Sequence, residues 1–131
     1  MLRVSSPLTD VQEATVARVI DCAFAVHRAL GPGFRERIYA TAFRFELESR
    51  SLPFESEKAI EVRYRDWRIP GQRVDLVVAG FIVVEMKAIP RLTGLHRRQV
   101  LSYLRTMNLR IGLLINFNVE VLKHGLRRIV N

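Results

Sequence analysis

Three charged residues in apolar parts of this chain have the types and the spacing that could do chemistry. Glu85 and Lys87 stand two apart in FIVVEMKAI, residues 81–89, and Asp75 stands ten residues before Glu85. Charges are rarely buried in a sheet without a partner or a function. A divalent cation would relieve the repulsion between two carboxylates, and a lysine beside it could orient water or stabilise charge on a phosphate. These residue types are therefore typical of metal-assisted hydrolysis of a phosphate ester.

Whether the two carboxylates meet depends on the turn between the two strands that carry them. A two-residue loop would pair Asp75 with Val84 and send the carboxylates to opposite faces. A three-residue loop of residues 78–80, ending in a left-handed Gly80, would pair Asp75 with Val83 and put both acids on one face. Glycine is what the third position of such a loop requires, so we expect the three-residue loop.

A purely structural arrangement is the alternative. On one face of a strand, the Lys87 amine could simply form an ion pair with Asp75 or with Glu85 at the end of the sheet. The acid-x-lysine pattern on strands also arises by chance, so the residue types alone leave this alternative open.

Hydrophobic periodicity predicts the elements that must position these residues. They are helices at 10–30, 34–50 and 95–107, and strands at 58–65, 74–78, 81–89, 110–117 and 125–130. The apolar strands, covered by helices, favour an α/β fold with a mixed central sheet. Residues 1–131 are expected to form one domain, because the chain contains no repeat, linker or low-complexity segment.

Glu36 lies in the first turn of the second predicted helix. It falls on the same face as the apolar stripe formed by Tyr39, Ala40, Phe43 and Leu47. A carboxylate there is favourable through the helix dipole alone. Its direction towards the core stripe leaves a role in a site equally open.

A tryptophan follows the first predicted strand. In that strand Ile60, Val62 and Tyr64 alternate with charged residues, which predicts a half-buried strand. Trp67 then falls in a predicted turn region that ends at Pro70-Gly71. We expect Trp67 to pack over a sheet edge rather than to stack on a base.

The charge balance indicates a polyanionic partner. The chain of 131 residues has 21 Lys and Arg against 13 Asp and Glu, a net charge of +8. Its single cysteine fits a reducing compartment, and it lacks both a signal-peptide pattern and a run of about 18 apolar residues. We therefore expect a cytoplasmic protein that does not enter membranes.

The motifs carry a family resemblance. The hairpin pattern VDL…VVEMK resembles the motif of the PD-(D/E)XK nuclease superfamily. GQRVD at 71–75 and QVLSY at 99–103 look like the outer motifs, GxxxD and QxxxY, of its recombination-exonuclease branch. GFRERIY at 33–39 resembles the signature of the GxxExxY family within that superfamily.

The resemblance implies the restriction-endonuclease-like core, α-β-β-β-α-β, with an extra N-terminal helix. It implies Asp75 and Glu85 as ligands of Mg²⁺ or Mn²⁺ and Lys87 as the catalytic lysine. Glu36 would be the acid contributed by the first core helix, and a further metal ligand. Gln99 would lie near the site on the last core helix.

The function expected is metal-dependent hydrolysis of nucleic acid, with DNA favoured over RNA. Contacts to nucleic acid are expected from residues near the predicted site, namely Tyr103, Arg91, Arg97, Arg98 and Lys58. One alternative is a non-catalytic nucleic-acid-binding module, and another is a protein-interaction subunit whose partner supplies the activity. The small size is also compatible with a homodimer that pairs apolar strand edges near the C-terminus.

Overall fold

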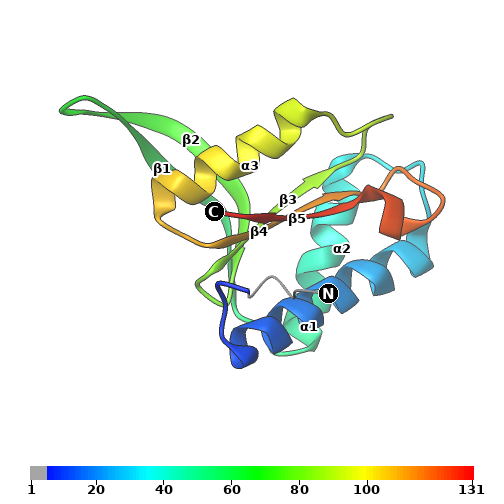
Figure 1. Ribbon diagram of the computed structural model, residues 1–131. Coiled ribbons are helices and arrows are strands. Elements are labelled where there is room, and N and C mark those ends of the chain that lie inside the picture. Colours follow the sequence, from blue (N-terminus) through cyan, green and yellow to red (C-terminus); the bar gives the residue numbers. More distant parts are fainter. Residues whose placement is uncertain (1–5) are drawn as a thin grey trace, which may run out of the picture.

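The structure is a computed structural model that describes residues 6–131 (Figure 1). Three helices form: α1 (Asp10–Leu30), α2 (Glu36–Ser49) and α3 (Gly94–Met107). The strands are β1 (Phe54–Tyr64), β2 (Trp67–Val78), β3 (Ile82–Lys87), β4 (Ile111–Asn116) and β5 (Leu126–Val130), the last preceded by a 3₁₀ turn, η1 (Leu122–Gly125). The predicted order of helices and strands is confirmed.

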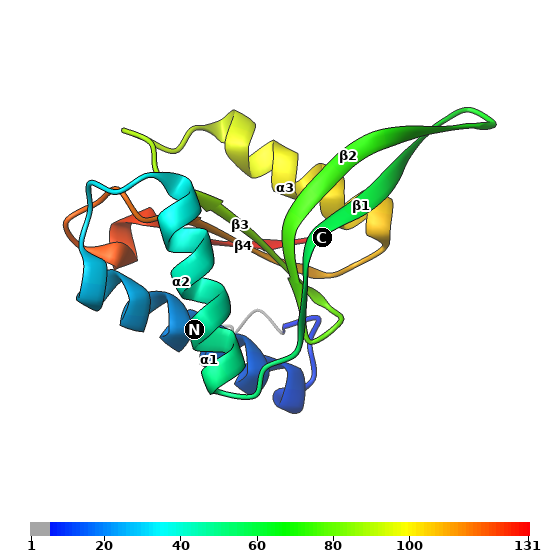
Figure 2. The same cartoon turned by 180° about the vertical axis from the view of Figure 1, so that it is seen from behind.

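One mixed sheet organises the molecule, with strand order β1-β2-β3-β4-β5. β3 and β4 are parallel, joined by α3 as the crossover, and the other neighbours are antiparallel. α3 covers one face of the sheet and α1 and α2 cover the other, as Figures 1 and 2 show from opposite sides. The predicted α/β fold with a mixed central sheet flanked by helices is confirmed, and β3 is its middle strand.

Two apolar clusters lie on the two faces of this sheet. Alternate residues of β3 divide between them: Ile82, Val84 and Met86 pack with α1 and α2, and Val83 packs with α3. All residues of β4 are buried, which explains its unbroken apolar sequence. No helix within residues 6–131 has both the length and the apolar character needed to cross a bilayer.

The loop between α1 and α2 fixes where α2 begins. Gly31 and Gly33 have φ of +66° and +108°, values that favour glycine. The Tyr39 hydroxyl donates to the Gly31 carbonyl at 2.6 Å and accepts from the backbone N–H of Phe34 at 3.1 Å. One buried tyrosine thus ties the loop to the first turn of α2 and sets the position of Glu36.

The first two strands are longer than predicted and their burial is different. β1 begins at Phe54, and β2 begins at Trp67 and runs through Pro70-Gly71, where a bulge shifts the register opposite residue 61. Of the alternating apolar residues only Ile60 is buried, while Val62 and Tyr64 are 40% and 53% exposed. The prediction of a half-buried strand was wrong beyond Ile60, because this hairpin extends past the helices that would cover it. The predicted turn at 66–71 is shorter and lies at residues 65–66.

Gly125 offers a stability prediction. A Cβ atom there would collide with the backbone carbonyl oxygen of Asn116, which cannot swing away as a side chain can. Gly125→Ala should therefore lower the free energy of unfolding by about 2 kcal/mol, measured by urea denaturation. Gly94→Ala is the matched control, because an added Cβ meets nothing within 4 Å there, and equal stability of the two variants would contradict the prediction.

Candidate active site

The hairpin between β2 and β3 brings Asp75 opposite Glu85. Val78 pairs with Ile82, and Leu76 with Val84, so continuing this register places the two acids across from each other. The loop has three residues, as predicted, but they are 79–81 rather than 78–80, and Ala79 as well as Gly80 has positive φ. The predicted pairing of Asp75 with Val83 was wrong by two residues, and a shift of two preserves the face.

The two carboxylates are held by backbone amides at the point where the hairpin ladder ends. Asp75 N–H donates to Glu85 Oε1 at 2.9 Å, and Met86 N–H donates to Asp75 Oδ2 at 2.9 Å. Each acid thus uses one oxygen to replace a carbonyl of the ladder and retains a second oxygen outside these bonds. The side chains are fixed on rigid strands, which favours a preorganised site.

Glu85 is the most perturbed acid of the site. It is 4% exposed. Burial first, and then the negative charge of Asp75, raise the pKa of Glu85 to about 8, opposed by the Asp75 N–H and by the charge of Lys87. At neutral pH this carboxyl therefore largely keeps its proton, and a bound cation would take the place of that proton.

Lys87 shares the face of Glu85 and is half-buried. The ion pairs across residues 6–131 are Arg50–Glu46, Lys58–Glu55 and Arg128–Glu13, so none joins Lys87 to an acid. This observation disfavours the alternative in which the three charges form only a structural ion pair.

Asn116 holds the strand end that carries Lys87. It lies opposite Lys87 on β4 and is buried. Its amide both donates to and accepts from the backbone of Ile89, at 2.9 Å and 3.1 Å, and Phe117 N–H donates to the Lys87 carbonyl at 2.9 Å. The chain beyond β3 is thus bound to β4, which fixes the direction of β3 at its charged end.

Glu36 and Asp75 line one cavity of about 380 Å³ between α2 and the sheet. Burial, and next the charge of Asp75, raise the pKa of Glu36, while Lys87 lowers it. The Glu36 side chain stays largely exposed to water, so these influences are screened. The helical periodicity predicted that Glu36 lies on the face of the apolar stripe, and that face borders the cavity that contains Asp75.

Glu57 is a residue of this cavity that the sequence analysis missed. It stands on β1 across from Asp75 in the strand register, and its φ of +51° makes an irregularity in the strand. Nothing in the alternating sequence pattern indicates this left-handed residue. Three neighbouring strands therefore each bring one carboxylate, Glu57, Asp75 and Glu85, to the same end of the sheet.

Gln99 and Tyr103 lie on the sheet-facing side of α3. Gln99 lines a second cavity, of about 530 Å³, together with Lys87 and Arg98. Tyr103 is buried, and its hydroxyl accepts a hydrogen bond from Gln72 Nε2 at 2.8 Å. Burial, and then the charges of Glu85 and Asp75, raise the pKa of Tyr103, while hydrogen bonds to Gln99 and Gln72 lower it. The α3 pair thus lies near the two acids.

The basic residues predicted to contact nucleic acid lie at four different places in the structure. Arg98 lines the cavity beside Lys87, whereas Arg97 lines a separate cavity with Arg127. Arg91 is exposed in the segment after β3. Lys58 is bound to Glu55 in an ion pair of 2.7 Å on β1. Of these, Arg98 shares a cavity with two of the predicted catalytic residues, Lys87 and Gln99.

The donor set consists of carboxylate oxygens. Within residues 6–131, no three acidic, histidine or cysteine side chains already lie close enough together to hold a metal ion. Hard cations such as Mg²⁺ are typically bound by one or two carboxylates, with waters and substrate phosphate completing the shell. The pair Asp75 and Glu85 fits that chemistry, with Glu36 across the cavity.

The fold and this arrangement define a class of protein, namely α/β proteins in which a central β-hairpin presents two acids and a lysine on one face of the sheet. A family model described as the PD-(D/E)XK nuclease superfamily matches residues 13–129, and the chain belongs to that superfamily. The superfamily consists typically of nucleases, and these generally use divalent metals such as Mg²⁺. Searches of curated proteins and of solved structures gave no match.

Proposed function

We propose that this chain is a Mg²⁺- or Mn²⁺-dependent nuclease that hydrolyses phosphodiester bonds of DNA, formed by one domain and akin to the GxxExxY family. The observation that carries the proposal is the pair of opposed carboxylates, Asp75 and Glu85, each bound to a backbone amide in a sheet core. The +8 net charge supports a nucleic-acid substrate.

In this proposal Asp75 and Glu85 would hold the cation, with Glu36 as a further acid across the cavity. The cation would supply positive charge that activates water and stabilises charge on the phosphate. The site residues then work from fixed positions on β2, β3 and α2.

Lys87 would orient the attacking water or stabilise charge on the phosphate through its amine. Its position on the same face as Glu85, without an ion pair in residues 6–131, leaves the amine available for this role. Gln99 would assist at the same cavity, and Arg98 would contact a backbone phosphate.

Lys87→Met tests the proposed role of the amine. Methionine keeps most of the apolar stem and removes the charge, so the fold should persist while cleavage falls by about a hundredfold or more. The measurement is cleavage of linear, nicked, branched and single-stranded DNA with Mg²⁺ or Mn²⁺. Binding without cleavage of any substrate by the wild-type protein would instead favour a non-catalytic binding module.

A further inference from the structure

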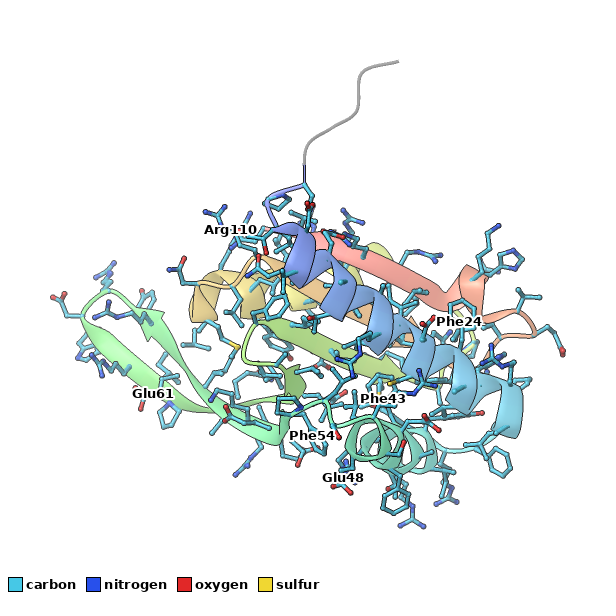
Figure 3. All side chains as sticks on the ribbon, turned by 90° about the horizontal axis from the view of Figure 1, so that it is seen from below. Phe24, Phe43, Glu48, Phe54, Glu61 and Arg110 are labelled. Atoms are coloured by element: carbon cyan, nitrogen blue, oxygen red, sulfur yellow. The ribbon has the colours of Figure 1, made fainter. Side chains whose placement is uncertain are left out.

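The hairpin of β1 and β2 projects beyond the body of the protein (Figure 1). We call residues 61–71 the arm; every one of them is exposed. Figure 3 shows the arm, marked by Glu61, reaching past the helices with side chains free around it. At its base Gln72 binds Tyr103 of α3. An isolated two-stranded ribbon is only marginally stable in water. An arm of this length with no covering element therefore suggests a function for its exposed side chains.

One face of the arm carries four exposed apolar side chains. Val62 pairs with Ile69 and Tyr64 with Trp67, and residues two apart on a strand share a face. Their exposed fractions are 40%, 49%, 53% and 65% respectively. The prediction that Trp67 packs over a sheet edge was wrong, because the sheet core ends before this part of the hairpin.

The arm tip has the form of a stacking platform. The rings of Tyr64 and Trp67 lie 6.2 Å apart and 22° from parallel, and the Arg65 guanidinium lies 5.4 Å from the centre of the Tyr64 ring. Because the two rings already lie together in the free protein, their side chains would lose little conformational entropy when a ligand binds. Planar bases are the ligands that such a surface suits.

The other face of the arm carries an excess of positive charge, because Arg63 and Arg68 line one cavity with a single acid, Glu61. Arg63 and Arg68 stand directly opposite each other, and like charges at this spacing destabilise a hairpin. Neither takes part in an ion pair within the described chain, residues 6–131. Two guanidinium groups side by side are suited to phosphate oxygens, which would remove the repulsion.

The arm also continues directly into the proposed active site. Trp67 and Asp75 are eight residues apart on β2, about 26 Å along an extended strand. That length corresponds to roughly eight stacked nucleotides. A strand of nucleic acid with one phosphate at Asp75 could therefore reach the arm tip.

We infer that the arm is a nucleic-acid-binding element that selects substrates with unpaired bases, on which Trp67 and Tyr64 stack while Arg63 and Arg68 contact phosphates. The inference rests on the proposed nuclease function for its substrate, but the binding it describes needs neither metal nor turnover. A purely apolar partner surface would leave the two arginines unexplained.

Trp67 is the single tryptophan of the chain, so its fluorescence reports on the arm tip directly. The protein is titrated in EDTA with a single-stranded oligonucleotide, a blunt duplex, and a duplex with a single-stranded overhang. We expect strong quenching and tighter binding with the single strand and the overhang. Unchanged fluorescence at saturation, or equal affinity for the blunt duplex, would overturn the inference.

Arm variants measure the two contacts separately by anisotropy of a labelled single strand. Trp67→Ala should weaken binding about tenfold, and Trp67→Phe should restore most of it. The double variant Arg63→Ala, Arg68→Ala should make the slope of log affinity against log salt shallower by about 1.4. Phe45→Ala on α2 and Arg28→Ala on α1 are exposed matched controls that should bind normally.

The outcomes separate this inference from the proposed function. Normal binding by the arm variants overturns the inference and leaves the nuclease proposal intact. Weakened binding by the arm variants in a protein that cleaves nothing supports the inference and removes the nuclease proposal. Normal binding together with a change in the size of the protein in solution would assign the apolar face to a second copy instead.

Discussion

Asp75→Asn is expected to lower divalent-cation-dependent cleavage by about a thousandfold or more while the protein stays folded. Asparagine has the same shape, and its amide oxygen can still accept the hydrogen bond that Met86 N–H donates to Asp75. Only the negative charge and one anionic oxygen are lost. Because the proposed cation supplies several kcal/mol of stabilisation to the reaction, losing its ligand should cost most of the rate.

A second measurement on Asp75→Asn is independent of turnover. Mn²⁺ should raise the melting temperature of the wild-type protein, because ligand binding to the native state stabilises it, and this gain should disappear in the variant. Asp21→Asn is the matched control, since Asp21 is exposed on α1. Cleavage by Asp75→Asn at the wild-type rate would show that the activity belongs to a contaminant or to another site.

That Asp75 and Glu85 lie on one face could be predicted from sequence, because it depends only on whether the loop between their strands has an odd or an even number of residues. A strand alternates its faces, so any odd-numbered loop between β2 and β3 puts Asp75 and Glu85 on the same side. Gly80 indicated an odd loop, and the structure has one. The exact pairing was missed because Ala79 also adopts positive φ, a conformation that alanine gives no reason to expect.

The direction of Glu36 was predictable for a similar reason. Helical periodicity fixes the face on which a residue lies, and the buried residues of α2, Tyr39, Phe43 and Leu47, are those of the predicted stripe. Periodicity does not give distance, however. That Glu36 borders the same cavity as Asp75 depends on how α2 packs on the sheet, which is a tertiary property.

The arm and Glu57 show where sequence reasoning stops. Alternation in β1 indicated two different faces but could not say what covers either one, and beyond Ile60 nothing does. Glu57 lies just before the predicted strand, which begins at residue 58, and in the sequence it is one more charged residue. Only its left-handed backbone and the neighbouring α2 make it part of the acidic cavity.

The raised pKa of Glu85 predicts that the metal-free protein loses stability as pH rises. Glu85 has a pKa of about 8 in the folded chain, against an ordinary value of 4.5. Between these values the native state binds more protons than the unfolded state, so the free energy of unfolding falls as pH increases. The loss over this window is on the order of a few kcal/mol.

Glu85→Gln should remove this dependence, since the glutamine oxygen can still accept from Asp75 N–H without carrying charge. In EDTA the variant should gain stability relative to the wild type between about pH 5 and about pH 8.5, measured by urea unfolding. Glu48→Gln, at an exposed position of α2, should show no such gain. Because metal binding needs the ionised acid, the melting-temperature gain from Mn²⁺ in the wild type should instead grow with pH. A stability difference between the wild type and Glu85→Gln that does not change with pH would mean that Glu85 is ionised without strain, and that the acid pair does not need a cation to relieve it.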